Sequence, residues 1–147
     1  MENNSGQAQR YERIRKDHSL EMAEDYTEAI REITEQSGRC RVADLARHFG
    51  VSHVTVYRTL TRLSNQGVVQ SSPYRSIALT PEGARLARRA SRRHRTVLRF
   101  LVALGVDQSS AAVDAEGIEH HISIATFRKF KEFALRESGA KERRPAA

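Results

Sequence analysis

The sequence predicts a mostly α-helical protein, in which an N-terminal winged helix-turn-helix with a small two-stranded wing precedes an all-helical domain. Three observations predict this fold class. Apolar residues recur at helical spacing along most of the chain, a glycine joins two short helices within residues 42–65, and residues 67–79 alternate as a β-hairpin does. The boundaries that we expect are residues 1–19 for a flexible arm, 20–80 for the winged helix-turn-helix, 81–138 for the helical domain and 139–147 for a loose tail.

The helix-turn-helix is predicted from three neighbouring segments. A first helix with a clear apolar stripe is expected over residues 20–35. Residues 42–49 then carry apolar side chains at i, i+3, i+4 and i+7, and Gly50 breaks that helix. Ser52 offers a side-chain oxygen to the start of a further helix over residues 53–65. This pattern favours a helix-turn-helix over the alternative, an ordinary helical hairpin.

Charge and side-chain chemistry predict that this segment binds DNA. The net charge is +7, and between Leu45 and Val106 the chain has eleven arginines but a single acid, Glu82. Hydroxyl, imidazole and guanidinium groups on the outward face of the second helix can bind base edges or phosphates. A hairpin directly after such a helix occupies the position of a wing. The expected DNA-contacting residues are Ser52, His53, Thr55, Arg58, Thr59, Arg62 and Arg75.

Capping residues mark three further helices. The first is expected to run from residue 81 to about residue 104, where Gly105 stops it; the others are expected over residues 110–122 and 124–138. The expected N-caps are Thr80, then Asp107 or Ser109, then Ser123. The last helix carries three phenylalanines, which we expect at a homodimer interface, although packing within one chain is the alternative. These are Phe127, Phe130 and Phe133.

Cysteine content and hydropathy exclude several classes of protein. Cys40 is the only cysteine, which rules out an internal disulfide and a cysteine-based zinc site and fits a reducing cytoplasm. No apolar run approaches the roughly 20 residues that a membrane span needs. We therefore expect a cytoplasmic protein without a membrane partner, and not an enzyme.

One acidic segment has the residue types of a metal site. Glu116, Glu119 and His120 would share one helical face, with Cβ atoms about 5–6 Å apart. Carboxylates so close repel each other unless a cation lies between them, and oxygen and nitrogen donors without sulfur suit a hard divalent cation. A second carboxylate pair, Asp25 and Glu28, lies three residues apart on the first helix. The alternative is a solvated acidic surface.

Several motifs together resemble the diphtheria toxin repressor family of metal-dependent transcription regulators. They are Glu24-Asp25-Tyr26-x-Glu28, the helix-turn-helix, Pro73-Tyr74-Arg75, Arg92-Arg93-His94, Leu104-Gly105-Val106 and Asp-Ala-Glu-Gly-Ile-Glu-His-His at residues 114–121. The resemblance implies metal ligands at Asp25, Glu28, His94, Glu116, Glu119 and His120. Iron-responsive members carry Met and Cys where this chain has Asp25 and Glu116, so the resemblance implies the manganese-responsive branch. It further implies Mn²⁺ at a binuclear site, with Fe²⁺ as a second candidate.

The resemblance and the charge pattern together suggest a mechanism. Without metal, the carboxylates of the two domains would repel one another. Mn²⁺ would neutralise them, fix the DNA-binding head against the helical core, and set the spacing of the two recognition helices of a homodimer on a palindromic DNA operator. The expected function is repression of manganese-uptake genes, without an organic cofactor. The alternatives are a winged-helix regulator that senses a small organic ligand and a carboxylate-bridged di-metal enzyme.

Overall fold

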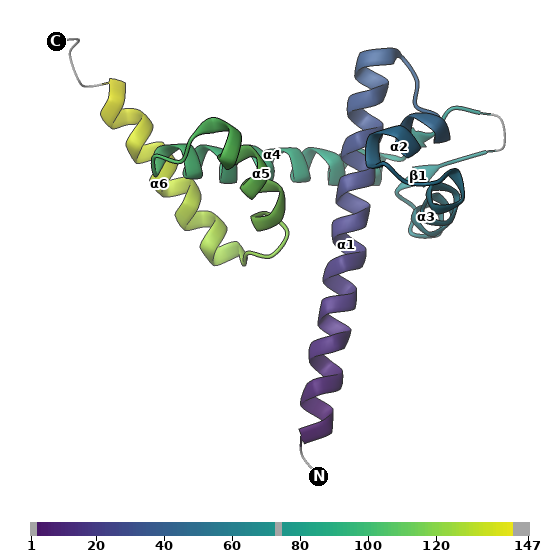
Figure 1. Cartoon of the computed structure of the whole chain (residues 1–147), viewed down its shortest axis with the longest axis horizontal. Coiled ribbons are helices and arrows are strands. Elements are labelled where there is room, and N and C mark those ends of the chain that lie inside the picture. The colour runs from purple at the N-terminus through teal and green to yellow at the C-terminus, as the bar shows by residue number, and fades with distance from the viewer. Residues whose placement is uncertain (1–2, 73–74, 143–147) are drawn as a thin grey trace. The chain divides into compact units, whose positions relative to one another are not determined.

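The chain is almost entirely helical. The structure is a computed structural model that describes residues 3–72 and 75–142 (Figure 1). In chain order the elements are α1 (Asn3–Ser37), α2 (Val42–Phe49), α3 (His53–Asn65), β1 (Val69–Gln70), β2 (Ala78–Leu79), α4 (Pro81–Ala103), α5 (Gln108–Ile118) and α6 (Ile124–Glu142). The predicted fold class is confirmed, and the chain divides into two compact units, Met1–Ala90 and Ser91–Ala147.

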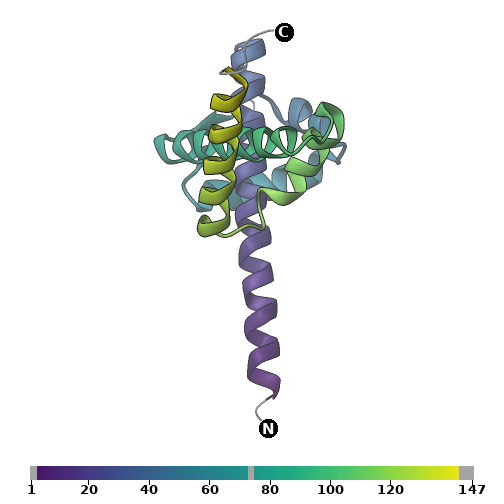
Figure 2. The same cartoon turned by 90° about the vertical axis from the view of Figure 1, so that its left-hand side faces the viewer.

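Helix α1 begins much earlier than the sequence predicts, at Asn3. Its N-terminal part extends beyond the other elements of the first unit (Figure 2), and the side chains of residues 6–18 are exposed. The apolar stripe starts only after this part, where Tyr26 and Ile30 are buried in the core. Gly38, at φ 76°, ends the helix in the left-handed conformation. The segment expected as a flexible arm is therefore the first part of a single long helix.

Helices α2 and α3 form the predicted helix-turn-helix, with the predicted bounds. Gly50, at φ 64°, takes the left-handed conformation between them. The Oγ atom of Ser52 accepts a hydrogen bond from the backbone N–H of Thr55 at 3.2 Å and caps α3. Leu45 of α2 and Leu60 of α3 are buried in the core of the first unit. A shared apolar core therefore fixes the position of α3 in the head.

Strands β1 and β2 form the predicted wing. They pair antiparallel, with Val69 opposite Leu79. Cys40 forms an isolated β-bridge with Ile77, and both side chains are buried. This bridge ties the wing to the segment between α1 and α2. The tip of the wing, residues 73–74, lies outside the described residues.

Helix α4 begins at the base of the wing. The Oγ1 atom of Thr80 accepts a hydrogen bond from the backbone N–H of Gly83 at 3.1 Å and donates one to the carbonyl of Gly67 at 2.6 Å. A Cβ atom at residue 83 would overlap the carbonyl oxygen of Val68. Only glycine therefore lets the wing lie directly against the first turn of α4.

The second unit contains the C-terminal part of α4 together with α5 and α6. Val97 of α4 and Ala111 of α5 are fully buried in its core. The ring of Phe130 stacks on that of Phe100 with centroids 3.8 Å apart, and Phe133 meets Phe100 edge-on at 5.5 Å. Phe130 and Phe133 thus pack within one chain, as the alternative expected, and a dimer interface at the three phenylalanines stays a prediction.

Two helix ends differ from the sequence prediction. Helix α5 ends at Ile118, four residues early, so the turn after it carries the last residues of the acidic segment. Helix α6 continues through Gly139 to Glu142, because Gly139 does not adopt the positive φ that ends α1 and α2. The remainder of the expected tail, residues 143–147, lies outside the described residues.

The predicted N-caps are confirmed at Thr80, Asp107 and Ser123. In the described chain, none of the helices is long and apolar enough to pass through a lipid bilayer.

Candidate metal centre and DNA-binding face

The second unit contains a compact group of metal-ligand side chains. His94 lies on α4, Glu116 in the last turn of α5, and Glu119 directly after α5. One ligand atom from each lies within 4.8 Å of the others. The Nδ1 atom of His94 is 2.8 Å from Oε2 of Glu119 and 3.5 Å from Oε1 of Glu116. Three of the predicted ligands are therefore brought together within one unit.

The end of α5 explains how these side chains come together. The backbone N–H of Glu119 still donates to the carbonyl of Ala115 at 3.0 Å, so the helical path is kept up to this residue. The chain then turns, and the Nε2 atom of His120 lies 3.4 Å from Oε1 of Glu119. The Nη2 atom of Arg93 donates to the carbonyl of Ile122 at 2.9 Å and holds the chain after the turn. A fourth predicted ligand, His120, thus lies beside the same carboxylate.

Burial makes Glu119 the central member of this group. Its exposed fraction is 2%, whereas the side chain of Glu116 is exposed. A buried carboxylate is costly unless a positive charge or hydrogen-bond donors compensate it. The donors on both sides of Glu119 are the imidazoles of His94 and His120. Carboxylate oxygens and imidazole nitrogens without sulfur are the ligands that Mn²⁺ and Fe²⁺ accept, so these residues fit a divalent cation of that kind.

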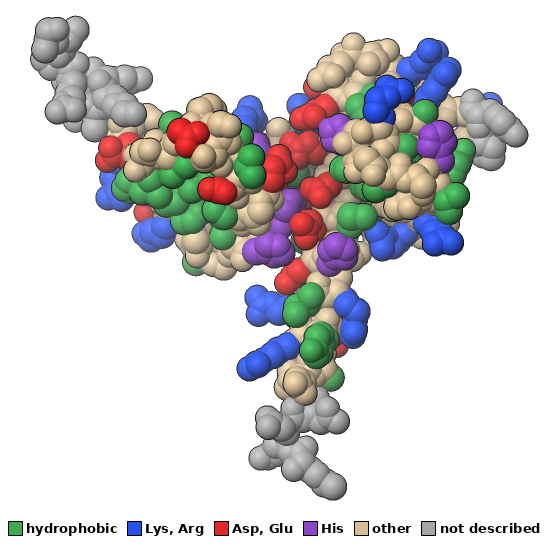
Figure 3. Space-filling view, in the orientation of Figure 1, with side chains coloured by type: hydrophobic (Ala, Val, Ile, Leu, Met, Phe, Trp, Pro, Cys, Tyr) green, Lys and Arg blue, Asp and Glu red, His purple; other side chains and the backbone are tan. Residues whose placement is uncertain are grey.

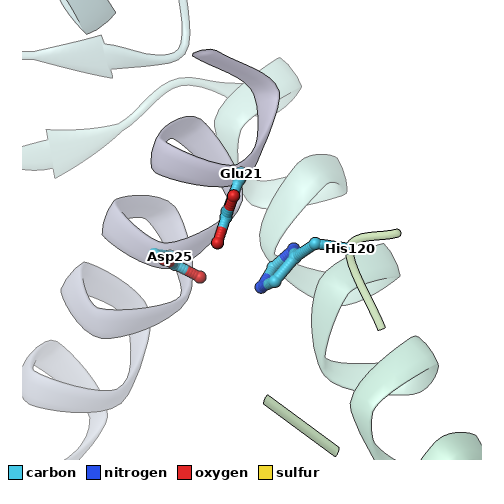
Figure 4. A group of neighbouring side chains, drawn as sticks. All are labelled: Glu21, Asp25 and His120. Carbon is cyan, nitrogen blue, oxygen red and sulfur yellow. The ribbon is translucent and has the colours of Figure 1, made fainter. Parts of the chain in front are cut away.

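Helix α1 of the first unit has carboxylates of its own. Asp25 and Glu28 are half-buried, and a carboxylate oxygen of Glu21 lies within 4.8 Å of one from Asp25. Figure 4 shows that Glu21 and Asp25 extend from the same side of α1. Glu21 was missed from the sequence, although its place one helical turn before Asp25 could have indicated it. Whether the α1 carboxylates complete the site stays a prediction.

The predicted DNA-contacting residues are not all on one face. Five of them on or next to α3 are exposed, and so is Arg75 on the wing. These five are Ser52, His53, Thr55, Arg58 and Arg62. The assignment of Thr59 to the outward face is wrong, because Thr59 is 5% exposed and its hydroxyl donates to the carbonyl of Thr55 at 3.0 Å. It lies on the same side as the buried Val56 and Leu60.

Two exposed residues on α3 were not predicted. Val54 is 60% exposed and Tyr57 is 57% exposed. Hydrophobic side chains lie beside Lys and Arg side chains over α3 in the space-filling view (Figure 3). The signal was present in the sequence, since Val54 and Tyr57 are three residues apart and out of phase with the buried stripe of Val56, Leu60 and Leu63.

Both units match family models of known regulators. Residues 19–77 match the iron dependent repressor N-terminal DNA binding domain, and residues 80–136 match the iron dependent repressor metal binding and dimerisation domain. The transcriptional regulator MntR of Salmonella typhimurium is 39% identical over 132 residues, which cover 90% of this chain and 84% of that protein. The HTH-type transcriptional regulator MntR of Bacillus pumilus is 36% identical over 100 residues, covering 68% of this chain and 69% of the relative.

Solved structures of metal-dependent regulators are also similar to this chain. The manganese regulator SloR superposes with a TM-score of 0.67 at 26% identity, covering 78% of this chain and 54% of that one. A manganese-dependent transcriptional repressor in complex with manganese also has a TM-score of 0.67, at 30% identity and with coverages of 77% and 52%. The chain spans about half the length of these two solved proteins. It therefore belongs to the iron-dependent repressor family and, like its relatives, is a DNA-binding transcriptional repressor that responds to metal.

Proposed function

We propose that this protein is a manganese-responsive repressor, in which Mn²⁺ promotes DNA binding and the regulated genes serve manganese uptake. The observation that carries the proposal is the donor set of His94, Glu116 and Glu119, whose ligand atoms lie within 4.8 Å of one another. The set contains oxygen and nitrogen donors only, which favours Mn²⁺ over metals that prefer sulfur. Fe²⁺ is the second candidate, because it accepts the same donors. The names of the relatives support manganese.

The full ligand set extends to both units in this proposal. The resemblance implies ligands at Asp25 and Glu28 of α1 in addition to the group around Glu119, and we include them in the proposal. Four carboxylates with two oxygens each and two imidazoles offer about ten donor atoms, more than the six positions of one octahedral cation, which supports a binuclear site with bridging carboxylates. When bound, the cations supply the positive charge that allows these carboxylates to share one site.

The residues of the chain perform the switch. Without metal, the carboxylates on α1 and those around Glu119 repel each other, which disfavours any fixed arrangement of head and core. Metal binding selects one arrangement from this population and adds no DNA contact of its own. In a homodimer this sets the separation of the two α3 helices, as a palindromic operator requires. We place this activity in the cytoplasm, where the DNA is.

The two alternatives that the sequence left open receive no support from the matched proteins, which are metal-responsive transcriptional regulators. That family implies a regulator and not an enzyme. A sensor of a small organic ligand would bind DNA equally well with chelator and with Mn²⁺. The same titration therefore tests the alternative and the proposal together.

The experiment is fluorescence anisotropy with a labelled duplex from upstream of the host's manganese-importer gene, at physiological salt. Protein is titrated with chelator, with Mn²⁺ and with Fe²⁺, against a scrambled duplex, since so basic a chain binds any duplex at low salt. We expect sequence-selective binding only with metal, and loss of the metal response in Asp25→Ala and Glu119→Ala. Glu35→Gln, which changes an exposed carboxylate on α1, is the matched control. Equal binding with chelator and Mn²⁺ would refute the proposal.

A further inference from the structure

Two large apolar side chains lie on the exposed side of α3. Val54 and Tyr57 are more than half exposed, and α3 buries its other apolar residues, Val56, Leu60 and Leu63, in the core of the head. Residues three apart on a helix are neighbours on its surface. Val54 and Tyr57 therefore form one apolar patch, which we call the α3 patch.

The position of the α3 patch argues against incidental exposure. Single exposed apolar residues are common on soluble proteins and need no explanation. These two are adjacent, however, and they belong to the second helix of a helix-turn-helix, whose N-terminal residues contact base edges in the DNA-binding motifs of this class. Val54 is the second residue of α3 and Tyr57 the fifth. Exposed His53 and Arg58 next to them give the surrounding surface a basic character that suits a polyanion.

The chemistry of the major groove offers one apolar group to such a patch. Of the four bases, only thymine presents a methyl group there, at C5, while the other groups on the base edges are hydrogen-bond donors and acceptors. The valine side chain has no hydrogen-bonding group, so a methyl group is the base feature that it can bind favourably. The Tyr57 ring has apolar faces and an edge that can do the same.

We propose that the α3 patch contacts thymine methyl groups, so that this repressor prefers thymine at two neighbouring positions of each half-site. Three residues along a helix rise about 4.5 Å, and stacked base pairs are about 3.4 Å apart. Val54 and Tyr57 thus reach adjacent base pairs. The polar and basic neighbours bind phosphates or other base edges, while the patch supplies the sequence preference. The inference rests on the DNA-binding role of the head.

The test removes the methyl group and leaves the rest of the base unchanged. Operator duplexes are selected from a random pool with the full-length protein and Mn²⁺. Each thymine of the best duplex is then replaced, one at a time, by deoxyuridine. For the unaltered protein we expect deoxyuridine to lower the affinity about fourfold wherever the α3 patch contacts the thymine methyl. This factor corresponds to the free energy of burying one methyl-sized group. Other thymines should give no loss.

The variants Val54→Ala and Tyr57→Ala assign each position to a side chain. Both residues are exposed, so truncation leaves the core of the head intact. We expect each variant to bind the thymine duplex more weakly and to lose the deoxyuridine penalty at its own position. Ile124→Ala, which truncates a side chain 68% exposed on α6, is the matched control and should keep every penalty.

The outcomes separate this inference from the metal switch. If no deoxyuridine replacement weakens binding, or if both variants keep every penalty, the inference is overturned while metal-dependent binding stands. If one variant keeps its penalties, the assignment is overturned for that residue alone. If no duplex is enriched with Mn²⁺ or with chelator, the DNA-binding role fails and the inference fails with it.

Discussion

The half-buried imidazole of His94 contacts the buried carboxylate of Glu119, with Nδ1 of His94 2.8 Å from Oε2 of Glu119. A cation at this position would need the Nδ1 atom of His94 free of hydrogen, because an imidazole nitrogen binds metal only in its unprotonated form. The pair keeps the donor atoms in place when no metal is bound.

Glu119→Gln should lower Mn²⁺ affinity by more than about tenfold, because it removes the buried negative charge while keeping the side-chain shape. Protein without metal should keep its melting temperature, since a buried charge is also removed. The rise of the melting temperature with added Mn²⁺ measures this. Glu132→Gln, on the exposed surface of α6, should behave like the unaltered protein. An unchanged Mn²⁺-dependent rise in Glu119→Gln would show that Glu119 is not a ligand.

Arg93 should act as a positioning residue for the turn after α5. Its Nη2 atom donates to the carbonyl of Ile122, and its buried Nε atom has no hydrogen-bond partner among the described residues. Arg93→Ala should cost about 1.5–3 kcal/mol of unfolding free energy, as for a hydrogen bond that involves a charged group. It should also weaken Mn²⁺ binding, measured by calorimetry, and Arg93→Lys should restore part of both. The control is Arg95→Ala, an exposed arginine on the same helix; equal losses there would contradict this role.

Arg58 and Thr59 are adjacent in sequence and should differ in DNA binding. Arg58 is exposed, and Arg58→Ala should reduce the slope of log affinity against log salt by about 1 if it binds a phosphate. Thr59 is buried, so Thr59→Val should leave DNA affinity unchanged. Salt titrations of both variants by anisotropy provide the measurement. A reduced affinity in Thr59→Val with an unchanged melting temperature would return Thr59 to the DNA-binding face.

Cys40 should be unreactive in the folded protein. Burial raises the pKa of its thiol to about 11, and the nearby Asp44 carboxylate adds to this. At about pH 8 the thiolate, which is the reactive form, is then roughly one molecule in a thousand. Iodoacetamide should modify Cys40 only after unfolding in urea, as mass spectrometry would show. Rapid modification of the native protein would mean that the β-bridge to Ile77 opens readily.

Asp107 should make the stability of α5 depend on pH. Hydrogen bonds from the backbone N–H and hydroxyl of Ser110 hold the pKa of Asp107 below its usual value. A carboxylate with a lowered folded-state pKa stabilises the protein above its unfolded-state pKa, and this contribution is lost as the pH falls through the folded-state pKa. Asp107→Ala should therefore melt at a lower temperature near about pH 7, and the difference should shrink as the pH falls below about 4, the usual pKa of an aspartate. A difference that is constant over this range would contradict the assignment.

The parts of the fold that the sequence predicted are those with a local physical signal. Gly50 and Ser52 mark the turn of the helix-turn-helix, and the pattern predicted both of its helices to the residue. The early start of α1 had no such signal, because an exposed helix without tertiary contacts needs no apolar stripe. Thr59 was wrongly predicted to face outward because it is polar. Its position between Val56 and Leu60 on the helix would have predicted the buried face.

The candidate metal site was likewise predictable only where the signal is local in sequence. Glu116, Glu119 and His120 were found from their spacing, although Glu119 and His120 lie past the end of α5 and not on its face. His94 came from the resemblance alone, since nothing in its own helix distinguishes it. Which ligands meet across separate helices depends on tertiary packing, and spacing within one helix carries no information about it.

The contact between Gly83 and Val68 has a consequence for how this regulator can diverge. Position 83 admits no side chain, so a library of random substitutions should return glycine there and little else. Val54 and Tyr57 are more than half exposed, so their substitution should have little effect on folding. Related proteins with this fold can therefore evolve to bind new operator sequences through a few substitutions on α3. The packing of the wing against α4 stays unchanged in the process.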